Sequence, residues 1–328
     1  MPQNRLERLP ARIADLYAKM HEFYKVTERL SKPNLKDHQI ATLMDELRDH
    51  DNSIARLKDK QITPLLAYME DASPNLRLER HGFRDNLRSA HDIAESLIQD
   101  HTQGIAVRLN GKIDSYRPLT ATDLQDVIHR VRYNTIYCLA VLRGIAAHHN
   151  VTVDEHSFPM HDVKEVLQMR AHKHIGKHEE PQNGPLHLHV HADPTETHIP
   201  AAALFGAIEL LVNGKKAVSP APEARILINF TRINGNRLVE VHDSGIGVTN
   251  ARATNLTNAA NAEQEVTSGF AQHEKIGIGS GKVLREVVRT SRHFTRKPDL
   301  NPFEIKPRSN NCDGFFKRRN GATASLRY

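Results

Sequence analysis

Residues 201–218 read AAALFGAIELLVNGKKAV, a stretch that is apolar over its first half and carries polar side chains at regular intervals in its second half. Glu209, Asn213 and Lys216 are spaced four and three residues apart, so they share one face of a helix. The apolar residues between them fall on another face. The pattern predicts an amphipathic helix over residues 201–217 that packs on a core and keeps one polar face.

Strand patterns surround this helix. Apolar residues alternate with histidines before it, and two β-branched segments after it are joined through Asn234-Gly235, a dipeptide that favours tight hairpin turns. Strands mixed with helices predict an α+β domain over residues 151–328. The expected strands are 186–191, 226–230, 238–241 and 322–328.

Two glycine-rich segments follow the helix. Residues 243–247 read DSGIG, in which a carboxylate could accept a hydrogen bond from a base amine while the backbone approaches without Cβ atoms. Residues 277–281 read GIGSG and precede a helical run over 282–288, whose free N–H groups would attract anions. The first segment suits an adenine and the second suits phosphates. Neither has the spacing of a dinucleotide fold or of a P-loop.

The first seventy residues carry apolar residues at helical spacing, interrupted at Pro33. Such a seam is buried only against a partner helix, which could come from the same chain or from a second copy. We expect a helical, coiled-coil signalling segment over residues 1–73, with dimerisation as the simplest source of the partner. The seam residues are Ile13, Leu16, Met20, Phe23, Leu30, Ile40, Leu43, Leu47, Ile54 and Leu57.

Residues 74–150 predict an antiparallel helical hairpin. Ser73-Pro74 is a helix start signal, Asn110-Gly111 predicts a tight turn, and Thr122-x-x-Gln125 resembles a capping box that opens a second helix. Two such hairpins would form a dimeric four-helix bundle. The expected seams are Leu76, Phe83, Leu87, Ala90, Ala94 and Leu97 in the first helix and Leu124, Ile128, Val131, Thr135, Cys138, Leu142 and Ile145 in the second.

The composition restricts the class of protein. The chain has 328 residues, 39% of them hydrophobic and 26% charged, which excludes a miniprotein and a disordered chain. The formal net charge is +6, but residues 282–328 alone hold 12 Lys/Arg against 4 Asp/Glu. Basicity confined to one segment is more typical of a solvated edge than of a nucleic-acid interface. We therefore do not expect nucleic acid as a partner.

The cellular setting also follows from residue usage. Two cysteines, Cys138 and Cys312, form neither a disulfide framework nor a four-ligand zinc site. Apolar runs stay far below the roughly 20 residues of a membrane helix, and the N-terminus lacks an apolar signal core. We expect a cytoplasmic protein with no membrane partner.

Together, the segments 209–216, 243–247 and 277–281 resemble the three sequence boxes of the GHKL ATPase superfamily, which includes gyrase, heat-shock chaperones, mismatch-repair proteins and histidine kinases. The resemblance implies an α/β sandwich that binds ATP and Mg²⁺. Asn213 would hold the magnesium ion, Asp243 would read the adenine amine, and Glu209 would lie beside the reacting phosphate. The binding residues that it implies are Asn213, Lys216, Asp243, Gly245, Gly247, Gly277, Gly279 and Gly281.

Residues 80–87, RHGFRDNL, resemble the phosphoacceptor box of sensor histidine kinases, in which a histidine is followed by an apolar and a basic residue. His81 would lie opposite the apolar stripe and face a phosphate donor. His129 and His91 are alternatives. Gly82 stands where many such kinases carry an acidic residue. The resemblance implies a homodimeric kinase that phosphorylates its own histidine and passes the phosphoryl group to an aspartate on a response regulator receiver domain.

Other functions fit parts of the sequence. An ATPase of the same superfamily could use ATP binding and hydrolysis for conformational change without autophosphorylation, with Glu209 polarising water. A degenerate ATPase could act only as a phosphotransfer scaffold. A third class is metal binding, because imidazoles hold Zn²⁺ or Cu²⁺ and His187, His189 and His191 share one strand face. His172, His174 and His178 lie nearby in the sequence.

Overall fold

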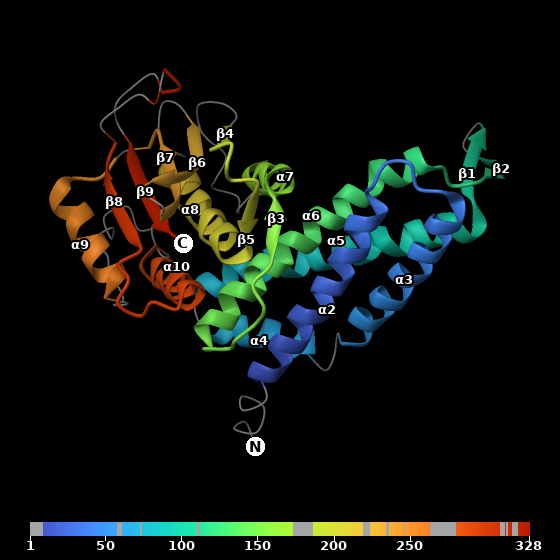
Figure 1. Ribbon diagram of the computed structural model, residues 1–328, viewed down its shortest axis with the longest axis horizontal. Coiled ribbons are helices and arrows are strands. Elements are labelled where there is room, and N and C mark those ends of the chain that lie inside the picture. Colours follow the sequence, from blue (N-terminus) through green and yellow to red (C-terminus); the bar gives the residue numbers. More distant parts are fainter. Residues whose placement is uncertain are drawn as a thin grey trace. The chain divides into compact units, whose positions relative to one another are not determined.

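The computed structural model describes residues 9–57, 61–72, 74–109, 112–172, 186–218, 224–233, 236–245, 247–262, 280–308, 312, 314–316 and 321–328. The chain divides into two compact units, Met1–Leu142 and Arg143–Tyr328 (Figure 1). The sequence predicted three segments with boundaries after residues 73 and 150. In the structure, the first of these segments and residues 74–142 of the second belong to one unit, whereas residues 143–150 belong to the other. Within the described ranges, no helix combines the length and the apolarity that crossing a lipid bilayer requires.

The first unit is helical, because its sequence repeats apolar residues every three or four positions. Its last helix, α6, continues into the second unit. A β-hairpin joins α5 to α6. The elements are α2 (Leu9–Leu30), α3 (Asp37–Arg56), α4 (Thr63–Ala72), α5 (Pro74–Gln103), β1 (Ile105–Leu109), β2 (Lys112–Arg117) and α6 (Ala121–His148).

Four helices, α2, α3, α5 and α6, form a bundle within this single chain (Figure 1). Helix α3 packs on both α2 and α5. Helix α6 completes the ring: Arg132 donates a hydrogen bond to the Ser31 hydroxyl at the end of α2 (2.8 Å), and the Cys138 thiol donates to the Phe83 carbonyl of α5 (3.7 Å). The bundle is therefore built from two hairpins of the same molecule.

The predicted seams are the core of this bundle. Every predicted seam residue of the first seventy positions is buried, and so are the described seam residues of α5 and α6. Leu76 lies in α5, but its side chain is outside the described residues. Because each seam finds its partner helices in its own chain, burial of these side chains requires no second copy. The homodimer stays a prediction, and the apolar seams no longer supply an argument for it.

The start of α6 differs from the sequence prediction. The Thr120 hydroxyl accepts a hydrogen bond from the Asp123 N–H (3.3 Å), and the Asp123 carboxylate accepts one from the Thr120 N–H (3.0 Å). This reciprocal pair is the capping box, two residues before the predicted Thr122 and Gln125. Arg117, at the end of β2, also binds the Asp123 carboxylate with two hydrogen bonds of 2.6 and 2.7 Å. That bidentate contact fixes where the chain enters the helix.

The second unit is built on a five-stranded sheet in the order β4-β6-β7-β9-β8. Strand β4 is parallel to β6, and the other neighbouring pairs are antiparallel. A separate antiparallel pair joins β3 and β5. The strands are β3 (Ser157–Pro159), β4 (His187–Ala192), β5 (His198–Pro200), β6 (Arg225–Ile233), β7 (Asn236–Asp243), β8 (Phe303–Pro307) and β9 (Ala322–Arg327).

Helix α8 is the central helix of this unit and packs on β6 and β7 (Figure 1). Helices α7 and α10 pack on α8, and α9 packs beside β8. The core between α8 and the sheet consists of Ile226, Ile228, Phe230, Val239 and Val241, each at most 2% exposed. These helices are α7 (Met160–His172), α8 (Ala201–Val218), α9 (Asn250–Asn261) and α10 (Ser280–Thr295).

The α+β class predicted from the sequence is confirmed. The predicted strands occur at those places, and the helix predicted over 201–217 is α8, which ends one residue later. Strand β8 and helix α9 were not predicted. The sequence of β8, FEIKP, is short and ends in proline, and α9 is rich in asparagine and threonine, so neither shows a strong periodic apolar pattern.

Phe23→Ala tests whether α2 belongs to the core of the bundle. Phe23 is 1% exposed, so its truncation should lower the free energy of unfolding by about 3–5 kcal/mol. Urea unfolding at low micromolar protein measures the change. Lys25→Ala, at an exposed position of the same helix, is the control and should change it by about 0.5 kcal/mol or less. A loss below about 1 kcal/mol for Phe23→Ala would mean that α2 is not packed in the isolated chain.

Candidate functional site

The three polar residues predicted on one helix face lie on the C-terminal half of α8. Glu209 is buried, with 3% of its surface exposed, whereas Asn213 and Lys216 are half-buried. Between them, Gly214 faces the sheet: a Cβ at this position would lie 3.2 Å from Ile226 Cδ1 and 3.8 Å from Asp243 Cβ. The absence of a side chain therefore lets α8 approach the end of β7, where the DSGIG segment begins.

The glycine turn after β7 lies directly against α8. A Cβ on Gly245 would lie 2.6 Å from the Ala217 carbonyl oxygen, so only glycine permits this backbone-to-backbone approach. Gly247 has φ of +82°, in the left-handed region that glycine adopts without strain. The structure thus brings the segments 209–216 and 243–247 together, two of the three that the sequence singled out.

Asp243 occupies a buried position at this junction, with 7% of its surface exposed. Its Oδ1 accepts hydrogen bonds from the N–H groups of Gly245 (2.8 Å) and Ala322 (3.3 Å). Within the described part of the chain, Oδ2 receives no hydrogen bond and keeps its capacity to accept one from a ligand. Burial raises the pKa of Asp243 to about 6, although the two N–H groups and the charge of Arg308 act in the opposite direction.

The neighbouring His242 points to the other side of the strand, as alternation along a strand requires. Its Nδ1 lies 2.9 Å from the Thr323 hydroxyl and its Nε2 lies 3.3 Å from the Asn229 amide nitrogen. Burial, together with the nearby positive charges of Arg308 and Lys306, lowers the pKa of His242 to about 4. The ring is therefore neutral at physiological pH, and it links β7 to the neighbouring strands β6 and β9.

The third predicted segment lies mostly outside the described residues. Gly277 and Gly279 are not among them, and Gly281 lies in the first turn of α10, which begins at Ser280. Helix α10 itself packs on α8: a Cβ on Gly206 would lie 3.7 Å from Val287 Cγ1. The helix that follows the predicted phosphate segment is thus adjacent to the helix that carries Asn213.

Two residues that contact Asp243 were not predicted from the sequence to belong to the site. Arg308 is 4% exposed, donates a hydrogen bond to the Asp243 carbonyl (3.1 Å) and stacks on the Phe316 ring at 3.8 Å. Gly321 has φ of +133°, and a Cβ there would overlap with the Asp243 carbonyl oxygen. Arg308 belongs to the basic C-terminal segment that we expected to be a solvated edge, so part of that charge is internal. Charge counting gave no signal of this, because it does not distinguish buried from exposed arginines.

The candidate phosphoacceptor histidines differ in their surroundings. His81 lies in α5, but its side chain is outside the described residues. His91, ten residues later on α5, places Nδ1 2.9 and 3.0 Å from the two carboxylate oxygens of Asp51 on α3. His129 on α6 has a buried Nδ1 with no hydrogen-bond partner among the described residues and stacks on Tyr133.

Gly82, where the resemblance expects an acidic side chain, faces α6. A Cβ on Gly82 would overlap with the Tyr137 hydroxyl. A larger residue at this position would therefore require the buried Tyr137 side chain to shift.

The described histidines of the histidine-rich strand are not arranged to bind a metal ion. His187, His189 and His191 are exposed along β4, an edge strand of the sheet, and His189 lies beside the Phe315 ring. Among the described residues, no group of three or more His, Cys, Asp or Glu side chains is placed to hold a metal ion. The histidines 174 and 178, which the metal hypothesis also used, lie outside the described residues.

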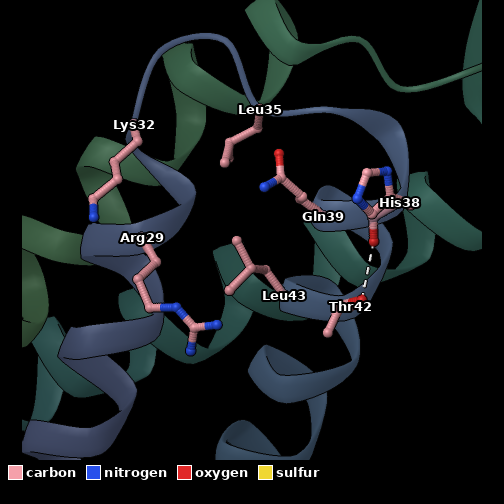
Figure 2. A pocket seen from close by; sticks show the side chains of 7 residues that line it. All are labelled: Arg29, Lys32, Leu35, His38, Gln39, Thr42 and Leu43. Atoms are coloured by element: carbon pink, nitrogen blue, oxygen red, sulfur yellow. Dashed lines mark hydrogen bonds between the residues drawn. The ribbon is translucent and has the colours of Figure 1, made fainter.

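Two surface pockets lie elsewhere. One, of about 300 Å³, is at the turn between α2 and α3, where Arg29 and Lys32 face His38 and Gln39 across Leu43 (Figure 2). The other, of about 640 Å³, lies between α9 and the strands β7, β8 and β9. Neither is lined by Asn213 or Asp243.

Comparisons with known proteins give little. No protein-family model matches the chain, and no curated protein matches it. The structure of the histidine kinase AdeS from Acinetobacter baumannii aligns with 73% of this chain and 95% of that chain, at 12% sequence identity and a TM-score of 0.31. A likeness at that TM-score carries no argument, so the site has to be interpreted from its own geometry.

Gly245→Ala tests the contact between the glycine turn and α8. The added methyl group meets backbone, which cannot rotate away, so we expect a loss of about 1–3 kcal/mol in the free energy of unfolding. Gly214→Ala is the matched control: its methyl group comes closest to the end of the Ile226 side chain, meets Asp243 Cβ at an ordinary contact distance of 3.8 Å and has no backbone atom of the sheet among its nearest contacts, and alanine favours the helix. Thermal and urea unfolding compare the two variants. Equal effects would contradict the close approach at Gly245.

The pH dependence of stability follows from the two adjacent buried groups. The pKa of Asp243 is raised to about 6, so its contribution to stability falls as pH rises from about 4 to about 6. The pKa of His242 is lowered to about 4, so its contribution is present above about pH 6.5 and is lost as pH falls toward 4. In the wild-type protein the two slopes oppose each other.

Asp243→Asn should leave only the contribution of His242 to the pH dependence of stability, because asparagine still accepts the same two N–H hydrogen bonds but does not titrate. The stability of the variant relative to wild type should rise by roughly 3 kcal/mol between pH 4 and pH 7. Urea unfolding across this range measures it. His242→Gln should change relative stability in the opposite direction over the same range. A pH-independent difference for Asp243→Asn would show that this carboxyl titrates normally.

Proposed function

We propose that this chain is an ATP-dependent protein histidine kinase of the GHKL type, which phosphorylates one of its own histidines and passes the phosphoryl group to a receiver-domain aspartate. The observation that carries the proposal is the contact between the C-terminal half of α8 and the turn after β7. There, Asn213 lies one residue before Gly214, which approaches Asp243, and Gly245 lies against Ala217. The segments 209–216 and 243–247, each of which has residues suited to binding a nucleotide, thereby lie against each other.

The residues at this place fit an adenine nucleotide. A buried carboxylate with one oxygen held by backbone N–H groups and the other able to accept suits an exocyclic base amine. The Cβ positions of Gly245 and Gly247 would face the backbone of Ala217 and Gly321, so the glycines let this turn pack closely beside Asp243. Gly277, Gly279 and the helix N-terminus at Gly281 would flank the phosphates, as the resemblance implies.

The same place fits a magnesium ion bound together with phosphates. Mg²⁺ prefers oxygen ligands and keeps several waters, so the half-buried Asn213 could supply one ligand without a full protein cage. When bound, the ion would neutralise negative charge that develops on the phosphates. Lys216, one turn further along the same helix, would add a positive charge beside them.

The role of the protein in this reaction is mainly to position groups and to balance charge. Glu209 is buried below Asn213 on the same helix face and would lie near the reacting phosphate. The resemblance assigns the acceptor to His81 on α5. Neutral imidazole is a competent nucleophile near neutral pH, and an aspartate on a response regulator would then take the phosphoryl group.

Incubation with γ-labelled ATP and Mg²⁺ tests this function. Wild type should gain an acid-labile, alkali-stable label, and Asn213→Ala should reduce the initial rate at least about tenfold, a loss of about 1.4 kcal/mol of stabilisation. Asn255→Ala, at an exposed position of α9, is the matched control and should label like wild type. Circular dichroism confirms that each variant is folded.

The outcomes separate the competing functions. Release of phosphate without protein label would favour an ATPase that never phosphorylates itself. Neither label nor phosphate release, with no heat of ATP binding in calorimetry, would overturn the nucleotide assignment for α8 and the turn after β7.

A further inference from the structure

A buried carboxylate and a half-exposed histidine face each other between α3 and α5. Asp51 is 5% exposed, and both of its oxygens lie within 3.0 Å of His91 Nδ1. The His91 side chain keeps 39% of its surface exposed. The pair joins residues 40 positions apart, and no sequence pattern linked them.

The direction of this contact decides which ring nitrogen is reactive. A carboxylate accepts hydrogen bonds, so it holds the proton of His91 on Nδ1 and fixes the tautomer in which Nε2 carries the lone pair. No residue in the described ranges forms a hydrogen bond with Nε2. A neutral imidazole held in this way has a nucleophilic nitrogen of fixed orientation.

Asp51 is also suited to stabilise the positive charge that develops on the ring. Burial raises the pKa of Asp51, and the nearby carboxylates of Asp92 and Glu95 raise it further, whereas its hydrogen bond to His91 lowers it. A proton shared between Nδ1 and this carboxylate can therefore move toward the oxygen when the ring loses electron density.

Of the other two candidates, only the side chain of His129 is among the described residues. His129 has its Nδ1 buried with no partner in the described part of the chain, so nothing there selects one tautomer. The side chain of His81 lies outside the described residues. Only His91 thus shows both a fixed ring and an exposed surface among the described candidates.

The exposed face of α5 beside His91 carries two arginines among carboxylates. Arg84 and Arg88 lie seven and three residues earlier, on the same face of the helix as His91. Their side chains are 50% and 81% exposed, although each also lies 3.4 Å from a neighbouring aspartate. Guanidinium groups at these positions would attract a phosphate chain that approaches the ring.

We infer that His91 is a phosphoacceptor of this chain and that Asp51 of the N-terminal hairpin is its positioning residue. The inference rests on the proposed kinase function and deepens it. His91 Nε2 forms the new N–P bond to the γ-phosphorus of a nucleoside triphosphate, while the bond to the β–γ bridging oxygen breaks and the nucleoside diphosphate leaves. The Nδ1 proton stays shared with Asp51, so no further reactant is needed.

This assignment gives the N-terminal helices a chemical role. Helix α3 would supply the carboxylate that activates a histidine on α5, and a shift of α3 along α5 would separate Asp51 from His91. A purely structural ion pair would instead affect only the stability of the bundle.

The test combines two variants with the identity of the phosphohistidine isomer. Purified full-length protein is incubated with γ-labelled ATP and Mg²⁺, the labelled residue is located by mass spectrometry, and isomer-specific antibodies distinguish phosphate on Nε2 from phosphate on Nδ1. Wild type should carry the Nε2 isomer on His91, and His91→Gln should lose the label at least about tenfold. His101→Gln, on the same helix, is the control.

Asp51→Asn isolates the carboxylate, because asparagine has nearly the same volume. Compared at equal folded fraction, its initial labelling rate should fall about tenfold, whereas Asp45→Asn, at an exposed position of α3, should label like wild type. An unchanged rate in Asp51→Asn would limit the pair to a structural role. If His91→Gln keeps the full label on another histidine, the inference fails while the kinase function stands. If the wild-type protein itself gains no label, both the inference about His91 and the proposed kinase function are wrong.

Discussion

The burial of Asp243 at the junction of β7 and α8 is the constraint on which the second unit depends. A carboxylate in that position must have its hydrogen bonds supplied from inside the fold, and the N–H groups of Gly245 and Ala322 supply them. Those donors hold the glycine turn and the start of β9 in place, and Arg308 binds the carbonyl of the same residue. The turn also lies close to α8, the helix that carries Asn213, so one buried carboxylate organises two of the segments to which we assign nucleotide binding.

In the first unit the corresponding constraint is the burial of four apolar seams in one chain. Two hairpins, α2–α3 and α5–α6, provide each other with the apolar surface that a single hairpin could not bury. The pairing also brings α3 against α5, and it is there that Asp51 meets His91. If the proposed kinase function holds, the helices that complete the bundle would also set the chemistry of a histidine.

Much of the fold could be predicted from local pattern. The seams of α2, α3, α5 and α6, the start of α5 at Pro74 and the helix over 201–217 follow from spacing and capping signals that involve near neighbours in the chain. The start of α6 was placed two residues late because two overlapping capping patterns compete there, and the contact between Arg117 and Asp123 decides between them. Strand β8 and helix α9 carry too weak a pattern to be predicted, since their neighbours in space stabilise them.

For the site, the sequence by itself determined the residue types and their spacing: a polar helix face, an aspartate before two glycines, and several histidines on helices. The tertiary structure decided which of these meet and in what electrostatic state. It buried Asp243 and thereby raised its pKa, placed Arg308 inside, set the Tyr137 hydroxyl against Gly82, and set a carboxylate from α3 on Nδ1 of His91. The physical reason is that helix and turn formation depend on contacts within a few residues, whereas burial and ion pairing depend on groups that lie far apart in the chain and meet only when it folds.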